Sequence, residues 1–342
     1  MGLLVHSTDD ARRGLIGAMR YVATAGVTRP FVGDEAALVR SMAEAVGHIH
    51  GDGAKTDLAD LIARTEPWPD AERARSTLAA WLRTEHDREE AMHAAILVAL
   101  FARRPDAGAL HAARDIARHL GADTAILRDL EATASRDAVA AEADIFRRML
   151  AWKTGDDVDA VRDRLAAHPQ VVDTPPAAVE ALRRALATAG PGTVGAELAR
   201  YYDQTGFPIP GSPGEPPLEI IGRHDAHHVL TAYSTALEDE ICVAVFTAAN
   251  ARADATAYLA VVLLQWHQGI RLGFFDATRS KLDPHRIAAA AERGDRTTSD
   301  ITTPDWDWTG LLAEPLDQVR AAYGIPEGGT VGPHDPWTDA AR

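Results

Sequence analysis

The feature that most constrains the fold of this chain is a set of candidate metal ligands near residue 230. His224 and His228 are four residues apart, so on an α-helix they lie on the same face, and Asp225 adjoins that face. Two histidines at this spacing can bind one ion, as they do in the H-E-x-x-H zinc enzymes. We therefore predict one divalent-metal site, which also carries the catalysis, with these ligands: His224, Asp225, His228 and Glu240.

The position of Glu240 restricts the path of the backbone. Twelve residues of continuous helix would place Glu240 roughly 18 Å from His228, too far for both side chains to bind one ion. A shared ion therefore requires the first helix to end within residues 233–237 and a second helix to return toward it. Ser234 and Thr235 are suited to such a turn. Facing helices that each supply ligands are a known arrangement in helical bundles.

Each of these residues also has an ordinary explanation. Histidines one turn apart are often surface or core side chains that bind no metal. Asp225 fits a solvated helix charge, and Glu240 fits an acidic residue that stabilises the first turn of a helix. The combination of four ligand types at a coherent spacing favours the metal site over these separate explanations.

The rest of the sequence predicts an all-α fold with two helical domains. Alanine, leucine, arginine and glutamate recur throughout, and no segment alternates apolar and polar residues long enough to predict a strand. With 342 residues the chain is long enough for two cores. We expect a helical domain at residues 1–155, followed by a linker with a connecting helix at residues 156–189. A helical bundle with the metal site between facing helices is expected at residues 190–325, and a flexible tail poor in apolar residues at residues 326–342.

Charge and apolar content restrict the partners. The net charge of -15 repels phosphate backbones, so nucleic acid is not expected as a partner. The single cysteine, Cys242, cannot form an intramolecular disulfide, which fits a reducing compartment. The longest apolar run, residues 257–266, is about half of the roughly 20 residues that span a bilayer. We therefore expect a cytoplasmic protein without a transmembrane segment, and leave peripheral contact with a membrane open.

Three segments resemble the Coq-four family of coenzyme Q (ubiquinone) biosynthesis proteins. The family motif H-D-x-x-H, eleven residues, then E is present with the same spacing. Upstream, residues 190–202 are similar to the short P-x-G-[ST]-x-G segment that opens a helix in that family. Downstream, residues 305–306, 314–320 and 324–325 are similar to its D-W…P-L-x-x-V-R…G-I ending. The resemblance covers residues 190–325. One departure is Asp239, where the family usually has glycine.

The resemblance implies a helical fold with an apolar groove for an isoprenoid-type tail and a metal beside the head group. Members of the family are linked to oxidative decarboxylation of a prenylated aromatic ring and to holding other biosynthetic enzymes together. We expect zinc as the metal, with iron, manganese or cobalt left open because spacing does not choose among them. The expected partners are a hydrophobic small molecule or isoprenoid lipid, other biosynthetic enzymes and further copies of this chain.

Two alternatives to this function remain open. Lysine occurs only three times, at Lys55, Lys153 and Lys281, and so strong a bias toward arginine is typical of a GC-rich genome. Many bacteria with such genomes make menaquinone, so a related enzyme there could be a cyclase or lyase that acts on a polyketide-like substrate. The other alternative is a non-catalytic lipid-binding scaffold in which the metal only joins two helices.

The first half of the chain carries weaker patterns. Residues 35–135 resemble the TerB-like helical domains associated with tellurite resistance, through an acidic turn at residues 51–53 and the nearby Asp57 and Asp60. His48 and His50 precede this turn. Glu90 and His93 form an E-x-x-H pair of the type found in di-iron bundles, but only one copy is present, and a solvated helix face is the simpler explanation. We expect this half to be an interaction or regulatory domain.

Overall fold

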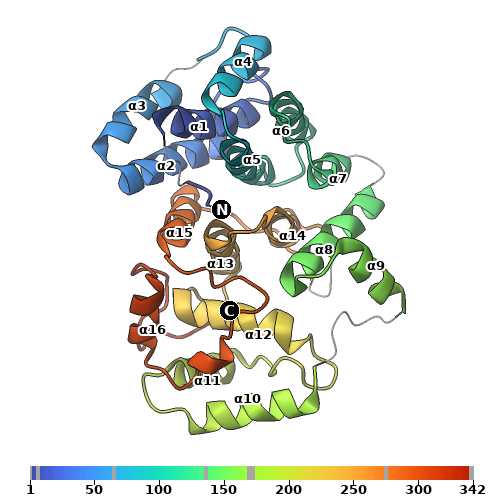
Figure 1. The fold of residues 1–342 in the computed structure, drawn as a ribbon, viewed down its shortest axis with the longest axis vertical. Coiled ribbons are helices and arrows are strands. Elements are labelled where there is room, and N and C mark those ends of the chain that lie inside the picture. The colour runs from blue at the N-terminus through green and yellow to red at the C-terminus, as the bar shows by residue number, and fades with distance from the viewer. Residues whose placement is uncertain are drawn as a thin grey trace. The chain divides into compact units, whose positions relative to one another are not determined.

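The computed structural model of this chain describes residues 2–4, 8–63, 67–134, 138–167, 174–272 and 276–338. These residues form α-helices and one 3-10 helix, with no strand among them and one isolated β-bridge between Thr193 and Pro315 (Figure 1). The all-α prediction is therefore confirmed. No helix in the described ranges is both long and apolar enough to cross a membrane.

The chain divides into two compact units, and the first comprises Met1–Met149 and Ala244–Asp295. Its helices are α1 (Asp9–Ala23), α2 (Gly33–His50), α3 (Asp52–Ala63), α4 (Ala71–Trp81), α5 (Glu85–Leu100), α6 (Ala107–Leu120), α7 (Ala125–Thr133), most of α8 (Ala138–Thr154), the second half of α13 (Leu237–Asn250), α14 (Thr256–Trp266) and α15 (Pro284–Arg296). The first division of the chain falls after Met149, and residues 244–295 group with the N-terminal helices.

Helix α5 lies at the centre of the first unit. A capping box starts it: the Thr84 hydroxyl accepts the Asp87 backbone N–H, and the Asp87 carboxylate accepts the Thr84 N–H. The following residues, 91–100, are almost all apolar and buried. Because α5 is apolar around most of its circumference, it packs against several partners, including α1, α6 and α14.

The second unit comprises Leu150–Val243 and Arg296–Arg342. Its helices are α9 (Val158–Ala167), α10 (Pro176–Thr188), α11 (Val194–Thr205), α12 (Leu218–Thr231), the 3-10 helix η1 (Thr309–Leu311) and α16 (Leu316–Tyr323), together with the end of α8 and the start of α13. Helix α11 packs against α10, α12 and α16, and α12 also packs against α16. The candidate ligands all lie in this unit.

Helix α11 is fixed at its N-terminus. The Thr193 hydroxyl accepts the Ala196 N–H as an N-cap. Gly195 donates its N–H to the Leu312 carbonyl at 2.9 Å, and a Cβ on Gly195 would lie only 2.7 Å from that oxygen. A glycine is therefore needed at this position so that the segment before α16 can approach closely. Val194 adds a second hydrogen bond between the same two segments, from its backbone N–H to the Glu314 carbonyl.

The described part of residues 326–342 packs against other residues of the second unit, in contrast to the loose tail that its composition predicts. Thr330 and Val331 donate backbone N–H groups to the Ala232 carbonyl at 2.6 and 2.9 Å. Trp337 is 2 % exposed, and its backbone N–H donates to the Gln204 side-chain oxygen at 3.0 Å. Residues 339–342 lie outside the described residues. A single buried aromatic side chain thus anchors a segment that is otherwise poor in apolar residues.

Candidate metal centre

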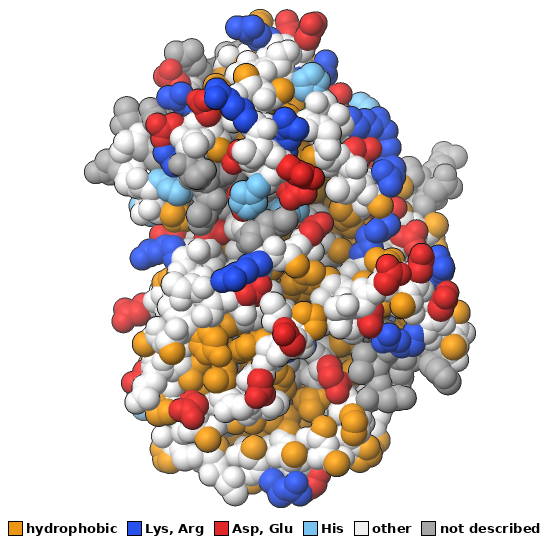
Figure 2. Space-filling view, in the orientation of Figure 1, with side chains coloured by type: hydrophobic (Ala, Val, Ile, Leu, Met, Phe, Trp, Pro, Cys, Tyr) orange, Lys and Arg blue, Asp and Glu red, His pale blue; other side chains and the backbone are white. Residues whose placement is uncertain are grey.

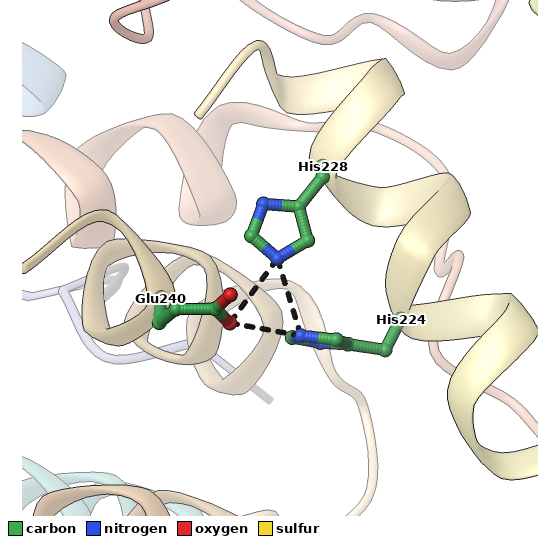
Figure 3. A group of neighbouring side chains, drawn as sticks. All are labelled: His224, His228 and Glu240. Carbon is green, nitrogen blue, oxygen red and sulfur yellow. Dashed lines mark hydrogen bonds and ion pairs between the residues drawn. The ribbon is translucent and has the colours of Figure 1, made fainter. Parts of the chain in front are cut away.

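Two helices of the second unit bring three of the predicted ligands together (Figure 3). His224 and His228 lie one turn apart on α12, and Glu240 lies in the first turn of α13. Glu240 Oε2 is 3.0 Å from His224 Nε2 and 3.2 Å from His228 Nε2, and the two Nε2 atoms are 3.2 Å apart. These residues are the one group of three or more candidate ligands found among the described residues.

The two helices are separated by a turn, as Glu240 requires, but the first helix ends two residues before the predicted range of 233–237. Helix α12 ends at Thr231, and Ala232 adopts a left-handed conformation with φ of 58°. Ser234 belongs to the turn, as predicted, because its hydroxyl accepts the Ala236 N–H. Helix α13 then begins at Leu237, which places Glu240 opposite the histidines.

The three ligand atoms fit one face of a tetrahedral metal site. A tetrahedral ion with bonds of about 2.0–2.1 Å separates its ligand atoms by roughly 3.3 Å, close to the three separations of 3.0–3.2 Å in this structure. Without an ion, Glu240 Oε2 can accept the Nε2–H groups of both histidines, because a carboxylate oxygen has two lone pairs. The same three atoms are thus arranged to bind protons or one metal ion.

A hydrogen bond at Nδ1 orients the Nε2 atom of His228 for metal binding. The Nδ1 atom lies 3.0 Å from the Tyr233 carbonyl oxygen and donates a hydrogen bond to it. In the neutral imidazole this fixes the proton on Nδ1, so that the Nε2 lone pair points toward the other two ligands. The His228 side chain is fully buried, and its ring stacks on the Tyr201 ring with centroids 5.7 Å apart. The ligand is therefore held from both sides.

When no metal is bound, the electrostatics of the group favour a positive charge on His228 and a negative charge on Glu240. Burial opposes both charges, but the attraction between them is stronger. It raises the pKa of His228 to about 9 and lowers that of Glu240 to about 2. Burial lowers the pKa of His224 to about 4, so this imidazole is neutral near pH 7. An ion that binds here displaces the His228 proton and keeps the negative charge of Glu240 as a ligand.

Asp225, the fourth predicted ligand, lies with two tyrosines and not with the other three residues. It is 4 % exposed, and its carboxylate accepts hydrogen bonds from the hydroxyls of Tyr202 at 2.7 Å and Tyr201 at 3.2 Å. One helical residue rotates the side-chain direction by about 100°, which moves Asp225 away from the face that carries His224 and His228. Burial raises the pKa of Asp225 to about 6. The structure thus brings together three of the four predicted ligands.

The position of Asp225 leads to a testable prediction. We expect Asp225→Asn to bind metal with an affinity within about tenfold of wild type, because the substitution removes no ligand of the three-residue group. Glu240→Gln is the matched change within that group and should weaken binding by more than about 100-fold. Titration of the metal-free proteins with Zn²⁺ in competition with a chelating dye measures both affinities. Equal losses in the two variants would make Asp225 a ligand.

Asp239, the departure from the family pattern, fixes the turn before Glu240. Its Oδ2 accepts the Ser234 backbone N–H at 3.0 Å and the hydroxyl of Ser234. The same oxygen accepts the hydroxyl of Thr330 from the C-terminal segment. The Asp239 carboxylate therefore holds together the turn between α12 and α13.

The sequence patterns do not single out the aromatic residues around His228. Tyr201 and Tyr202 end a family-like segment, and Trp337 falls within the predicted tail of residues 326–342. Trp337 lies edge-on to Tyr201, with ring centroids 5.5 Å apart. His227, a third histidine of α12, points away from the ligand group: its Nε2 lies 2.9 Å from the Ile301 carbonyl oxygen, and its ring stacks on Trp306.

The candidate residues of the first unit form no further metal group within the described ranges. Glu90 is 1 % exposed, so it does not lie on a solvated helix face; it pairs with His86 and accepts the Gly2 N–H. His93 pairs separately with Asp254. The candidates near the acidic turn are dispersed: His48 pairs with Glu292, His50 contacts the Leu4 carbonyl, and the side chains of Asp52 and Asp57 lie outside the described residues.

The chain matches no protein-family model, and comparisons with curated proteins and with solved structures also found no match. The likeness to the Coq-four and TerB-like families therefore rests on the quoted motifs alone. The geometry of His224, His228 and Glu240 is independent of that likeness.

Proposed function

We propose that this protein is a metal-dependent enzyme in which His224, His228 and Glu240 hold one divalent ion. The observation that carries this proposal is the triangle of ligand atoms with separations of 3.0–3.2 Å, formed by three protein residues and not four. Catalytic zinc sites commonly have three protein ligands and one open position, whereas structural zinc sites commonly have four. Zinc is the expected ion, and two imidazoles with one carboxylate also suit iron, manganese or cobalt.

The side chains determine where a substrate can approach. The side chains of His224 and Glu240 are 13 % and 12 % exposed, whereas that of His228 is fully buried. A ligand therefore reaches the site past His224 and Glu240. When bound, the ion would act as a Lewis acid and polarise a carboxylate or phenolate oxygen of the substrate.

A hydrophobic aromatic substrate is the class that we propose. The likeness to the Coq-four motifs suggests a prenylated aromatic acid and a decarboxylation. Two structural observations support an apolar ligand. Hydrophobic side chains gather on the surface over the helices of the second unit (Figure 2), and Phe207, 42 % exposed, lies edge-on to Tyr201, which stacks on His228. The rings of Phe207 and Tyr201 thus form a packed aromatic group between the surface and His228.

The free coordination position of the metal can be tested without knowledge of the substrate. We expect purified protein to contain about one metal equivalent per chain by plasma mass spectrometry. We also expect the Co²⁺-substituted protein to change its visible absorption when imidazole is added, because a free coordination position accepts an outside ligand. A protein that binds Co²⁺ but shows no response to imidazole would have a closed site and would favour the scaffold function.

The substrate class is tested next. Prenylated aromatic acids and polyketide-like acids are incubated with the metal-loaded protein, with and without oxygen, and release of CO₂ and loss of substrate are followed. We expect turnover of a prenylated aromatic acid that stops when the metal is chelated. Turnover only of the polyketide-like compounds would favour the cyclase or lyase alternative.

A further inference from the structure

Residues 329–337, which we call the C-terminal strap, bind the turn between the two helices that carry the candidate ligands. This turn comprises residues 232–236 and is named the ligand turn. Two backbone N–H groups of the strap donate to the carbonyl of Ala232, at distances of 2.6 and 2.9 Å. At the other end of the turn, the Thr235 N–H donates to the Trp337 carbonyl at 3.1 Å. The strap therefore holds the ligand turn at two separate points within the second unit.

The strap approaches the ligand turn so closely that glycine is required at position 329. Gly329 has a φ of 94°, in the region that favours glycine. A Cβ on Gly329 would lie 2.2 Å from the Ala232 carbonyl oxygen and 2.5 Å from that of Thr231. Both oxygens belong to the backbone, so they cannot move aside as a flexible side chain does. Any other residue at this position must therefore separate the strap from the turn.

One hydroxyl group of the strap joins both sides of the ligand turn. Thr330 Oγ1 accepts the Ser234 backbone N–H at 3.1 Å and donates to Asp239 Oδ2. Asp239 is 2 % exposed and directly precedes the candidate ligand Glu240 in the first turn of α13. A buried carboxylate requires hydrogen-bond donors in place of water. The Thr330 hydroxyl therefore helps to fix the backbone from which Glu240 projects.

The far end of the strap is fixed on α11 and supports the candidate ligand His228. The Trp337 ring lies edge-on to Tyr201, whose ring stacks on His228. The Trp337 backbone N–H donates to the Gln204 side chain, and the Arg200 guanidinium lies over the tryptophan ring, 5.2 Å from its centroid. The strap thus contacts the surroundings of ligands on both helices.

We propose that the C-terminal strap positions Glu240 and His228 and thereby determines how tightly the site holds its ion. This inference rests on the proposed metal site and deepens it, because it names the segment that controls metal retention. The physical reason is that one ion requires fixed separations of the ligand atoms, and groups that orient ligands typically contribute 10- to 100-fold to affinity. The strap lies outside residues 190–325, so the resemblance to the Coq-four family does not imply this role.

The test measures the Zn²⁺ affinity of the full chain by competition with a chelating dye, at a temperature at which every variant is folded. We expect Thr330→Val, which removes the hydroxyl and keeps the side-chain shape, to weaken binding roughly 10- to 100-fold. Thr330→Ser keeps the hydroxyl and should bind Zn²⁺ as wild type does. Gly329→Ala should weaken binding at least as much as Thr330→Val, because the added Cβ separates the strap from the turn.

Gly214→Ala is the matched control for Gly329→Ala. Gly214 lies in the second unit with a φ of 88°, so alanine introduces similar backbone strain. A Cβ on Gly214, however, would meet no atom within 4 Å in the described part of the chain. This variant should lose stability but keep wild-type Zn²⁺ affinity. Loss of affinity in the strap variants alone separates positioning of the ligands from general destabilisation.

Several results would overturn the role of the strap. Wild-type Zn²⁺ affinity in Thr330→Val would do so and would leave the metal site intact, even if Gly329→Ala fails to fold. Equal losses of affinity in Thr330→Val and Thr330→Ser, or in Gly329→Ala and Gly214→Ala, would also contradict it. Failure of the wild-type protein to bind Zn²⁺ would overturn the proposed function together with the role of the strap.

Discussion

His228→Ala should weaken metal binding by more than about 100-fold, so that the purified variant contains almost no metal. The substitution removes one of the three candidate ligands, and even residues that only orient a ligand typically contribute 10- to 100-fold to affinity. His228 is also the fully buried ligand, held by the Tyr233 carbonyl and the Tyr201 ring. Metal content by plasma mass spectrometry and Zn²⁺ affinity by competition with a chelating dye measure the loss.

A neighbouring histidine provides the control for this prediction. His227 is 1 % exposed and lies on the same helix, but its Nε2 contacts the Ile301 carbonyl and not the ligand group. His227→Ala should therefore lose packing and stability while it retains about one metal equivalent. Retention of wild-type affinity by His228→Ala, or equal loss in both variants, would contradict the proposed site.

Trp337→Ala should destabilise the second unit by about 3–5 kcal/mol, the usual cost of truncating a fully buried tryptophan. Trp337 is 2 % exposed, lies edge-on to Tyr201 and contributes backbone hydrogen bonds to Gln204 and Thr235. Because the chain has two units, amide hydrogen exchange resolved by segment is a better measurement than one melting curve. We expect faster exchange in α11 and α12 and unchanged exchange in α1 and α5.

Phe207→Ala is the control for Trp337→Ala, because it also removes an aromatic ring that contacts Tyr201, but one that is partly exposed. Phe207 also contacts Tyr201 but is 42 % exposed, so its removal should change the stability of the second unit by less than about 1 kcal/mol. If Trp337→Ala leaves exchange in α11 and α12 unchanged, residues 326–338 are a loose tail, as their composition predicts.

The sequence was sufficient to predict the parts of the site that depend on local geometry. Histidines four residues apart on a helix must share a face, and the demand that Glu240 reach them predicted a helix break before Glu240. The predicted helix end within residues 233–237 was two residues late, because α12 already ends at Thr231. The all-α fold followed from helix-forming composition without alternating segments. These inferences needed only distances along one or two helices.

The parts that the sequence did not predict depend on contacts between distant segments. Asp225 is a reasonable ligand by residue type, but the tyrosines that bind it lie more than 20 residues earlier on α11. Trp337 and Thr330 contact α11 and the turn before α13 across about 100 residues of sequence. No local pattern marks residues 244–295 as part of the first unit. Such pairings require the folded chain.

The turn after α12 supplies two different parts of the candidate metal site from one short stretch of backbone. The Tyr233 carbonyl orients His228, and the same turn sets the position of Glu240. Insertion of one residue after Leu237 would rotate Glu240 by about 100° around α13, and deletion of one residue would do the same in the opposite sense. Among related sequences that keep this metal site, the stretch between His228 and Glu240 should therefore be constant in length, even where its composition changes.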